Sequence, residues 1–330
     1  MRVVVTGGAG FIGSHYVRTA LTGGFAGFAP DELVVLDKLT SAGNRATLAP
    51  GARDPRLRLV VGDIGDRALA EQTLGGADLV VHFAAESHVD RSIDGAAEFV
   101  RTNVLGTQTL LAAALEAGVG RFVHVSTDEV YGSIETGSWP ETDPLLPNSP
   151  YAASKASSDL IARAFHRTHG MDVRITRCSN NYGPYQHPEK VVPLFVTNLL
   201  DGVPVPLYGD GGNSRDWLHV DDHCRGIQLV ADRGRAGEIY NIGGGTEMTN
   251  RELTERLLEA TGRDSSFVRP VTDRKGHDRR YSVDTTKITR ELGYLPRTSF
   301  SDGLAATVAW YRDNPGWWRP LKGCADSDER

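Results

Sequence analysis

The sequence has few cysteines, no long apolar run and no excess of positive charge, and each absence narrows the possible functions. Three cysteines stand among 330 residues, and their odd number and wide spacing argue against a disulfide framework and fit a reducing compartment. No apolar run approaches the roughly 18 residues that a membrane-spanning helix needs. The formal net charge is -6, whereas a nucleic-acid binder usually shows a basic excess. We therefore expect a cytoplasmic protein that binds neither a membrane nor a nucleic acid.

Apolar runs alternate with helical patterns over the first two-thirds of the chain. Val, Leu and Ile dominate these runs, as they do in strands that are buried on both faces of a sheet. The expected strands end at residues 7, 37, 64, 85, 127 and about 180. Such alternation predicts an α/β fold with a Rossmann-type, doubly wound parallel sheet.

The pattern changes from Pro193 onward, where shorter strands and helices predict a smaller C-terminal α/β domain. We expect a nucleotide-binding domain over residues 1–190, joined by a later segment around 215–245 if that part of the chain returns to the sheet. Residues 191–330 are expected to form mainly the substrate-binding domain. Within it, residues 279–294 (RRYSVDTTKITRELGY) predict a strand followed by a helix.

A glycine-rich loop, TGGAGFIG, follows the first expected strand and opens a helix. Gly7, Gly10 and Gly13 stand at three-residue spacing, and Gly8 fits the same dinucleotide fingerprint with the last two. Glycines permit a tight turn and a close approach of the backbone to a pyrophosphate, and the helix directs its N-terminal amides at the phosphates. A glycine trio alone also fits a structural turn, but its place between a strand and a helix predicts a dinucleotide site.

Acidic residues at the ends of the next two strands indicate which dinucleotide binds. Asp37 lies where a carboxylate accepts hydrogen bonds from the adenosine ribose, which favours NAD. The adjacent Lys38 leaves NADP open. Asp63, after the third strand, is a candidate for the adenine amine.

Tyr151 and Lys155 stand four residues apart at the start of a helical pattern, so they share a helix face. An ammonium near a phenol stabilises the phenolate and lowers the pKa of the phenol. A phenolate near neutrality is able to take the proton of an alcohol while hydride leaves its carbon. The alternative is an exposed tyrosine beside a solvated lysine. The nucleotide loop and the Ser126–Thr127 pair at the end of the preceding strand favour catalysis.

The chain resembles the extended short-chain dehydrogenase/reductase family over almost its whole length, and within that family the nucleotide-sugar 4,6-dehydratases. The stretches that carry the resemblance include TGGAGFIGS, ESHVDRSI, STDEVYG, SPYAASKASSD, CSNNYGPYQHPEK and GHDRRY. The resemblance implies a tightly bound NAD that is regenerated in each turnover. The residues expected to contact it are Gly7, Gly10, Phe11, Ile12, Gly13, Asp37, Lys38, Leu39, Thr40, Gly43, Asp63, Ile64, Phe83, Ala84, Ala85, Ser87, Thr102, Ser126, Tyr151, Lys155, Cys178 and Asn181.

Two adjacent carboxylates, Asp128 and Glu129, follow the strand that ends in Ser126–Thr127. Oxidation of an alcohol does not need them. A dehydration does, because a base must remove the C5 proton of a 4-keto sugar while an acid protonates the C6 hydroxyl. The resemblance assigns the acid to Asp128 and the base to Glu129, and it places Thr127 against the C4 oxygen beside Tyr151. The implied cycle is hydride transfer from C4 to NAD⁺, loss of water across C5 and C6, and return of the hydride to C6.

The resemblance implies dTDP-glucose as the small-molecule substrate. Cations are needed for its pyrophosphate, and arginine offers bidentate donors. The expected substrate contacts are Ser87, Thr127, Asn180, Glu189, Lys190, Val191, Pro206, Leu207, Tyr208, Arg215, Asn250, Arg274, His277 and Tyr281.

Other functions stay open at this point. They are a dehydratase or 4-epimerase acting on a UDP-, CDP- or GDP-linked hexose, and a non-catalytic NAD-binding sensor. We expect no metal site: the string His219, Asp221, Asp222, His223 is interpreted as a helix start with Asp221 as its cap. By resemblance we expect a homodimer that pairs through the helices near residues 102–117 and 151–169.

Overall fold

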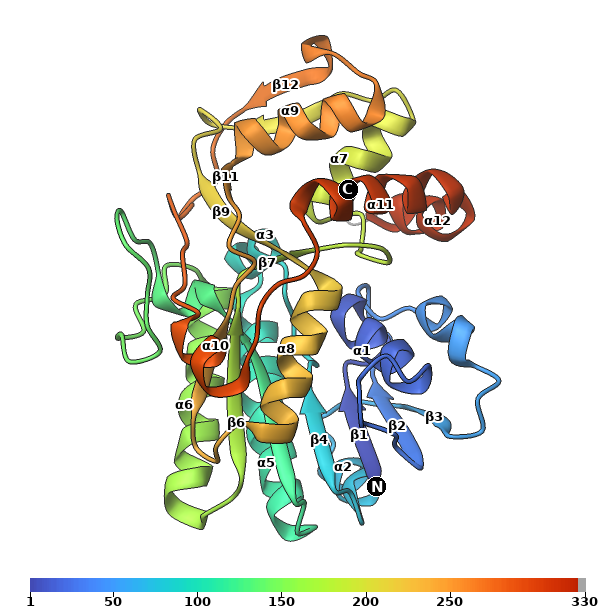
Figure 1. Cartoon of the computed structure of the whole chain (residues 1–330), viewed down its shortest axis with the longest axis vertical. Coiled ribbons are helices and arrows are strands. Elements are labelled where there is room, and N and C mark those ends of the chain that lie inside the picture. Colours follow the sequence, from blue (N-terminus) through green and yellow to red (C-terminus); the bar gives the residue numbers. More distant parts are fainter. Residues whose placement is uncertain (326–330) are drawn as a thin grey trace.

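The computed structural model describes residues 1–325 of the chain, with side chains to residue 322. Within this range seven parallel strands form one sheet, in the order β10-β6-β5-β4-β1-β2-β3 (Figure 1). The sheet consists of β1 (Arg2–Thr6), β2 (Glu32–Asp37), β3 (Leu57–Val61), β4 (Leu79–His82), β5 (Arg121–Thr127), β6 (Val173–Cys178) and β10 (Ile239–Ile242). The predicted Rossmann-type α/β fold is confirmed.

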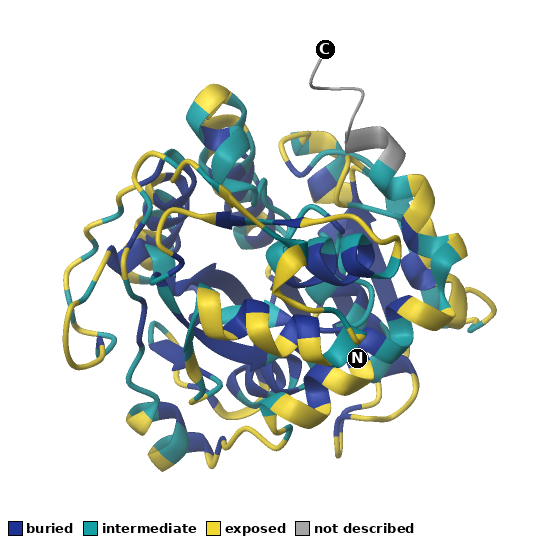
Figure 2. Cartoon of the chain, turned by 90° about the horizontal axis from the view of Figure 1, so that it is seen from above, coloured by how far each residue is buried: buried dark blue, intermediate teal, exposed yellow. Residues whose placement is uncertain are grey.

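Helices cover both faces of this sheet, because successive strand residues point to opposite sides. Val3 and Val5 belong to one buried cluster and Val4 to the other. The first cluster contains residues of α1 (Phe11–Leu21), α8 (Val220–Arg233) and α10 (Thr286–Leu292). The second contains residues of α2 (Arg67–Leu74), α5 (Thr107–Glu116) and α6 (Pro150–His169). Figure 2 shows the buried strands between helices whose outer faces are exposed.

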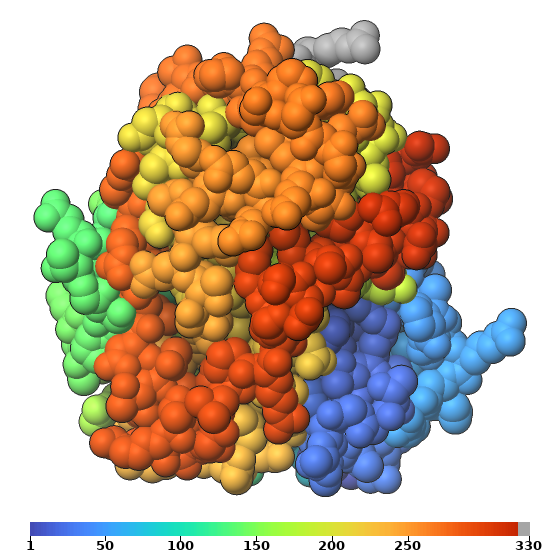
Figure 3. All heavy atoms as spheres, turned by 45° about the horizontal axis from the view of Figure 1, so that its top comes forward, coloured from blue at the N-terminus to red at the C-terminus, as the bar shows by residue number. Residues whose placement is uncertain are grey.

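A separate core lies above the carboxyl ends of the strands. It combines side chains from the helices α7 (Val191–Leu200), α9 (Asn250–Thr261), α11 (Phe300–Asp313) and α12 (Pro315–Ala325). Beside them, β8 (Val205–Tyr208) pairs with β12 (Val268–Val271), and β9 (Ser214–His219) joins β7 (Asn180–Tyr182) to β11 (Glu247–Thr249). Figure 3 shows this C-terminal region, yellow to red, covering much of the face that comes forward.

Shorter elements connect these layers. They are α3 (Val89–Asp94), α4 (Ala96–Phe99), a π-helical segment (Val100–Gly106), and 3₁₀ turns at Arg45–Gly51, Asp128–Tyr131 and Ser265–Phe267. No helix in the described part of the chain is both long and apolar enough to cross a membrane.

Two expectations about strands were wrong. The strands expected to end at residues 64 and 85 end at 61 and 82, because the backbone leaves the ladder there and turns along the edge of a cavity. The strand expected at the start of residues 279–294 is absent from the described structure. Within the described residues, that segment forms only two isolated bridges. Arg280 pairs with Ser214 at the start of β9, and Val283 pairs with Trp139.

Candidate active site

The glycine-rich loop joins β1 to α1 at one end of a cavity of about 300 Å³. A Cβ atom on Gly7 would lie 2.5 Å from the backbone nitrogen of Ala84, and one on Gly13 would lie 2.3 Å from the carbonyl oxygen of Gly7. Gly7 also has a φ of +68°, in the left-handed region that favours glycine. The loop therefore brings the backbone against the end of β4 and opens the first amides of α1 to the cavity, as a pyrophosphate cradle requires.

Asp37 is fixed at the end of β2 by two backbone amides. Its Oδ2 accepts a hydrogen bond from the amide of Ala9 at 2.9 Å, and its Oδ1 accepts one from the amide of Leu39 at 2.8 Å. The adjacent Lys38 forms an ion pair with Asp63, with 2.8 Å between Lys38 Nζ and Asp63 Oδ2. A carboxylate at the ribose position and a neutralised lysine beside it fit NAD better than NADP.

The cavity contains nearly all the residues that the sequence assigned to the cofactor. Those that line it are Gly7, Gly10, Phe11, Ile12, Gly13, Asp37, Lys38, Thr40, Gly43, Asp63, Ile64, Phe83, Ala84, Ala85, Ser87, Thr102, Ser126, Tyr151, Lys155, Cys178 and Asn181. Leu39 is the exception and does not line the cavity. Burial raises the pKa of the Cys178 thiol, so this cysteine is a lining residue and no thiolate nucleophile.

Tyr151 and Lys155 lie on the first turns of α6, which starts at a Ser149 cap and has Pro150 in its first turn. The Lys155 ammonium is buried and donates a hydrogen bond to the carbonyl oxygen of Val125 at 2.8 Å. The expectation of a lowered phenol pKa was wrong for the protein alone. Burial raises the pKa of Tyr151 well above its ordinary value, and the charge of Glu129 adds to this effect.

Asp128 and Glu129 sit in different surroundings although they are adjacent. Asp128 is 1% exposed, and burial, with the charge of Glu129, raises its pKa well above the ordinary value. Its Oδ2 is buried and has no hydrogen-bond partner within residues 1–325. Glu129 is half-buried at the cavity; burial raises its pKa too, but three cations, Arg274, Lys190 and Arg215, oppose that rise. The pair thus favours a protonated Asp128 beside a more readily ionised Glu129.

Thr127 connects this pair to the strand. As the cap of the 3₁₀ turn, it accepts a hydrogen bond from the Glu129 amide at Oγ1 and donates one to Asp128 Oδ1, both at 3.3 Å.

The expected substrate contacts divide into two groups. Ser87, Thr127, Asn180, Glu189 and Lys190 line the cavity, whereas Val191, Pro206, Leu207, Tyr208, Arg215, Asn250, Arg274, His277 and Tyr281 do not. Part of the second group still surrounds the carboxylates. The Arg215 guanidinium lies 4.1 Å from the centre of the Tyr281 ring. The charges of Arg274 and Arg215 both lower the pKa of Glu129. The Tyr208 and His277 rings contact edge-on at 6.3 Å.

Sequence reasoning missed some lining residues, namely Leu36, Ala42, Gly62, Glu86, Val125, Ser179, Gln186 and His187. Most of these are chain neighbours of residues that were predicted. Gln186 and His187 belong to the stretch CSNNYGPYQHPEK, whose resemblance to known dehydratases was the available signal.

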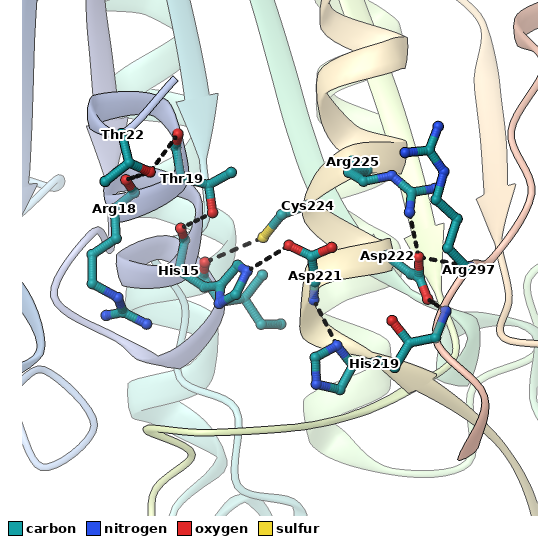
Figure 4. A network of polar contacts seen from close by, with 12 residues as sticks. His15, Arg18, Thr19, Thr22, His219, Asp221, Asp222, Cys224, Arg225 and Arg297 are labelled. Carbon is teal, nitrogen blue, oxygen red and sulfur yellow. Dashed lines mark hydrogen bonds and ion pairs between the residues drawn. The ribbon is translucent and has the colours of Figure 1, made fainter. Parts of the chain in front are cut away.

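The interpretation of Asp221 as a helix cap was wrong. His219 caps α8, because its side chain accepts the Asp221 amide, and the Asp221 carboxylate turns instead toward His15 on α1, 3.2 Å away (Figure 4). Asp222 is buried and accepts the backbone amides of Arg297 and Thr298. In the described part of the chain no group of three or more histidine, cysteine or acidic residues is arranged to hold a metal ion.

A Rossmann-type sheet, a glycine cradle and a buried tyrosine–lysine pair define an NAD-binding enzyme of the extended short-chain dehydrogenase/reductase class. The family model described as GDP-mannose 4,6 dehydratase matches residues 4–307. A dTDP-glucose 4,6-dehydratase of Streptomyces antibioticus is 64% identical over 98% of this chain and 96% of its own length. The chain belongs to the nucleotide-sugar 4,6-dehydratase family.

Solved structures agree with this assignment. DesIV, a dTDP-glucose 4,6-dehydratase from Streptomyces venezuelae crystallised with NAD, is 69% identical and superposes with a TM-score of 0.97, covering 97% of this chain and 100% of its own. A UDP-glucose 4-epimerase from Thermotoga maritima is 33% identical with a TM-score of 0.86, covering 96% and 100%. The fold is therefore shared with epimerases, and the residues of the site must separate the two reactions.

Proposed function

We propose that the protein is a dTDP-glucose 4,6-dehydratase, a hydro-lyase that forms dTDP-4-keto-6-deoxyglucose. The observation that carries this proposal is the adjacent pair of carboxyl groups, Asp128 kept neutral by burial and Glu129 surrounded by cations, beside Tyr151. An epimerase has no use for such an acid and base, since it only oxidises and reduces C4. The 64% and 69% identical relatives support the choice of dTDP-glucose.

NAD⁺, when bound, supplies the hydride acceptor for C4 and the hydride donor for C6. The residues of the chain provide the proton transfers. Tyr151 takes the proton of the C4 hydroxyl in its phenolate form, which the Lys155 ammonium favours against the burial that raises the pKa of Tyr151. Thr127 is the hydrogen-bond partner of that oxygen. Glu129 removes the C5 proton, and Asp128 protonates the C6 hydroxyl so that water leaves. The deep burial of Asp128 suits a group that must hold its proton until the sugar arrives.

The pyrophosphate of the substrate is proposed to lie among Lys190, Arg215 and Arg274. Arg274 Nε is buried and has no hydrogen-bond partner among the residues described, so it is available to a phosphate oxygen. The edge-on pair of Tyr208 and His277 is proposed to bound the nucleotide base.

Incubation with dTDP-glucose tests the function, with the product detected by its absorbance in alkali. Deuterium placed at C4 of the sugar is expected to appear at C6 of the product. The variant D128N/E129Q should keep NAD and lose water elimination by about 10²–10⁴-fold, the usual range for general acid–base catalysis. UDP-, CDP- and GDP-glucose in parallel test the other substrates. Product that is only C4-epimerised would contradict the proposal, and failure with every sugar nucleotide would favour an NAD-binding sensor.

We further propose that residues 1–190, together with α8 and β10, form the NAD-binding part, and that residues 191–330 mainly bind the nucleotide sugar. The pairing of β10 with β6 supports this division. The last five residues of the second part lie outside the described range.

A homodimer is supported by exposed apolar side chains on neighbouring helices. Leu105 on the π-helical segment is 57% exposed and Leu160 on α6 is 53% exposed. Two copies that pack these helices together would cover both side chains. The mass measured by light scattering tests this, and a monomer would contradict it. We propose a cytoplasmic location, which the reduced state of buried Cys178 and Cys224 supports and which fractionation of cells tests.

A further inference from the structure

α6 carries a third ionisable residue on the face that holds the tyrosine and the lysine. Tyr151, Lys155 and Asp159 stand at successive four-residue steps, so one helical turn separates each from the next. Asp159 does not line the cavity and is 0% exposed. The proposed chemistry does not use it, and burial of a carboxylate is costly unless a charge nearby compensates it.

We propose that Asp159 is a positioning residue that acts on the reaction through Lys155. Its negative charge, fixed one helical turn further along α6, keeps the buried lysine protonated beside Tyr151. This inference rests on the proposed function, because it assigns a role within the same tyrosine–lysine pair.

Arg177 on β6 holds Asp159 in its ionised form. Arg177 Nε lies 2.9 Å from Asp159 Oδ2, and the arginine is only 1% exposed. Burial alone would raise the pKa of Asp159, but the Arg177 guanidinium, together with His124 and Ser126, outweighs burial and lowers the pKa to about 2. The carboxylate is therefore charged throughout the range in which an enzyme of this kind works.

The guanidinium is itself held in place. Arg177 Nη1 donates to the Tyr131 hydroxyl at 2.8 Å, and that hydroxyl donates to Asn241 Oδ1 at 2.9 Å. The Arg177 guanidinium also lies 4.8 Å from the centre of the Tyr131 ring. Arg177 is thus oriented by a neighbouring side chain, and the charge of Asp159 has a fixed position.

Lys155 needs this support because its surroundings disfavour a positive charge. Burial lowers its pKa to about 8, and Asp159 is the group that opposes this most. The other titratable groups that face Lys155 come from β6, β4 and β5: Cys178, whose thiol is kept neutral by burial, and His82 and His124, whose pKa values burial lowers. Oδ1 of Asp159 lies 3.3 Å from Nε2 of His124. Among these groups Asp159 supplies the negative charge.

The test replaces Asp159 by Asn in the full-length protein and follows the titration of Lys155 by NMR of ¹³Cε-labelled lysine. The chain has six lysines, at positions 38, 155, 190, 275, 287 and 322, and K155M assigns the signal. We expect Lys155 in D159N to titrate about one pH unit lower, or more, since a charge one helical turn away has an effect of that size. The alkaline limb of the kcat/KM profile should shift with it, because fewer molecules then carry the ammonium.

Two further variants keep the test decisive. D159N/R177M removes both buried charges, so that no unpaired guanidinium remains to unfold the protein, and the Lys155 titration should still shift downward. D222N removes a carboxylate that is equally buried and paired with Arg225 at 2.7 Å on α8, and it should leave the titration unchanged.

An unchanged Lys155 titration in both Asp159 variants would overturn the inference, as would an equal shift in D222N. A protein that shows the shift yet makes no product from any nucleotide sugar would contradict the proposed function and leave the electrostatic inference standing.

Discussion

Lys190 donates a hydrogen bond from its ammonium group to the carbonyl oxygen of Ser87, with 2.6 Å between the two atoms. Ser87 follows β4 in the parallel sheet, and Lys190 immediately precedes α7 of the upper region. The bond therefore joins the two sides of the cavity. It also holds a cation close to Glu129, whose pKa is raised by burial and lowered by Arg274 and Lys190.

Replacement of Lys190 by Met is expected to shift the acid limb of the dehydration rate to higher pH by about one unit, the size of a nearby charge effect. With one opposing cation removed, the pKa of Glu129 rises, so the base is protonated at pH values where it was ionised before. Initial rates at saturating substrate across pH measure the shift. K287M is the control, because Lys287 pairs with Glu238 and neither residue lines the cavity. Coincident acid limbs for K190M and the unmodified enzyme would show that Lys190 does not influence the base.

Replacement of Gly13 by Ala is expected to weaken NAD binding at least tenfold, which corresponds to about 1.4 kcal/mol. The added Cβ would lie 2.3 Å from the carbonyl oxygen of Gly7, so the loop and α1 must separate. Calorimetric titration with NAD⁺ and the ratio of NAD to protein after purification both measure the loss. In G316A the new methyl group meets no atom within 4 Å, and this variant should bind NAD normally. Normal binding by G13A would mean that the cradle tolerates a side chain.

Replacement of Asp221 by Asn is expected to lower the free energy of unfolding at neutral pH by at most about 1 kcal/mol, because the contact of Asp221 with His15 is partly exposed. The hydrogen bond from His15 is the main reason that the folded-state pKa of Asp221 lies below its ordinary value. A carboxylate with a lowered pKa stabilises the fold above its unfolded pKa, and it loses this effect as the pH falls.

Denaturant unfolding at several pH values checks this expectation. The gap between D221N and the unmodified protein should be full at neutral pH and should close as the pH falls toward 4 and below. A gap that is constant with pH would assign the loss to packing rather than to the charge of Asp221.

The sheet and the cofactor loop could be predicted from the sequence because both depend on local patterns. Runs such as RFVHVST identify a buried strand by composition, and β5 ends at Thr127 as predicted. Residues at the carboxyl ends of parallel strands necessarily meet at one edge, so most of the cavity followed from the strand ends.

The remainder depended on which groups the fold brings together. The pKa of Tyr151 could not be read from its spacing to Lys155, since burial and the charge of Glu129 act on it more strongly. The position of Asp221 in the sequence is typical of a helix cap. In the fold its carboxylate instead contacts His15, more than two hundred residues away in the chain. Residues 279–283 have the composition of a strand, but in the described structure they pair with neighbouring segments only at Arg280 and Val283.

The position of β10 has a consequence for the order in which the chain acquires its shape. The edge of β6 is covered only when β10 arrives beside it, after the chain has passed through α7 and β9 and returned. During synthesis on the ribosome this edge stays open, and an open strand edge is a site for aggregation. The nascent protein therefore has to synthesise α7 and β9 of the C-terminal region before the seven-stranded sheet is complete. A fragment that stops at residue 190 would keep an unpaired, aggregation-prone edge on β6.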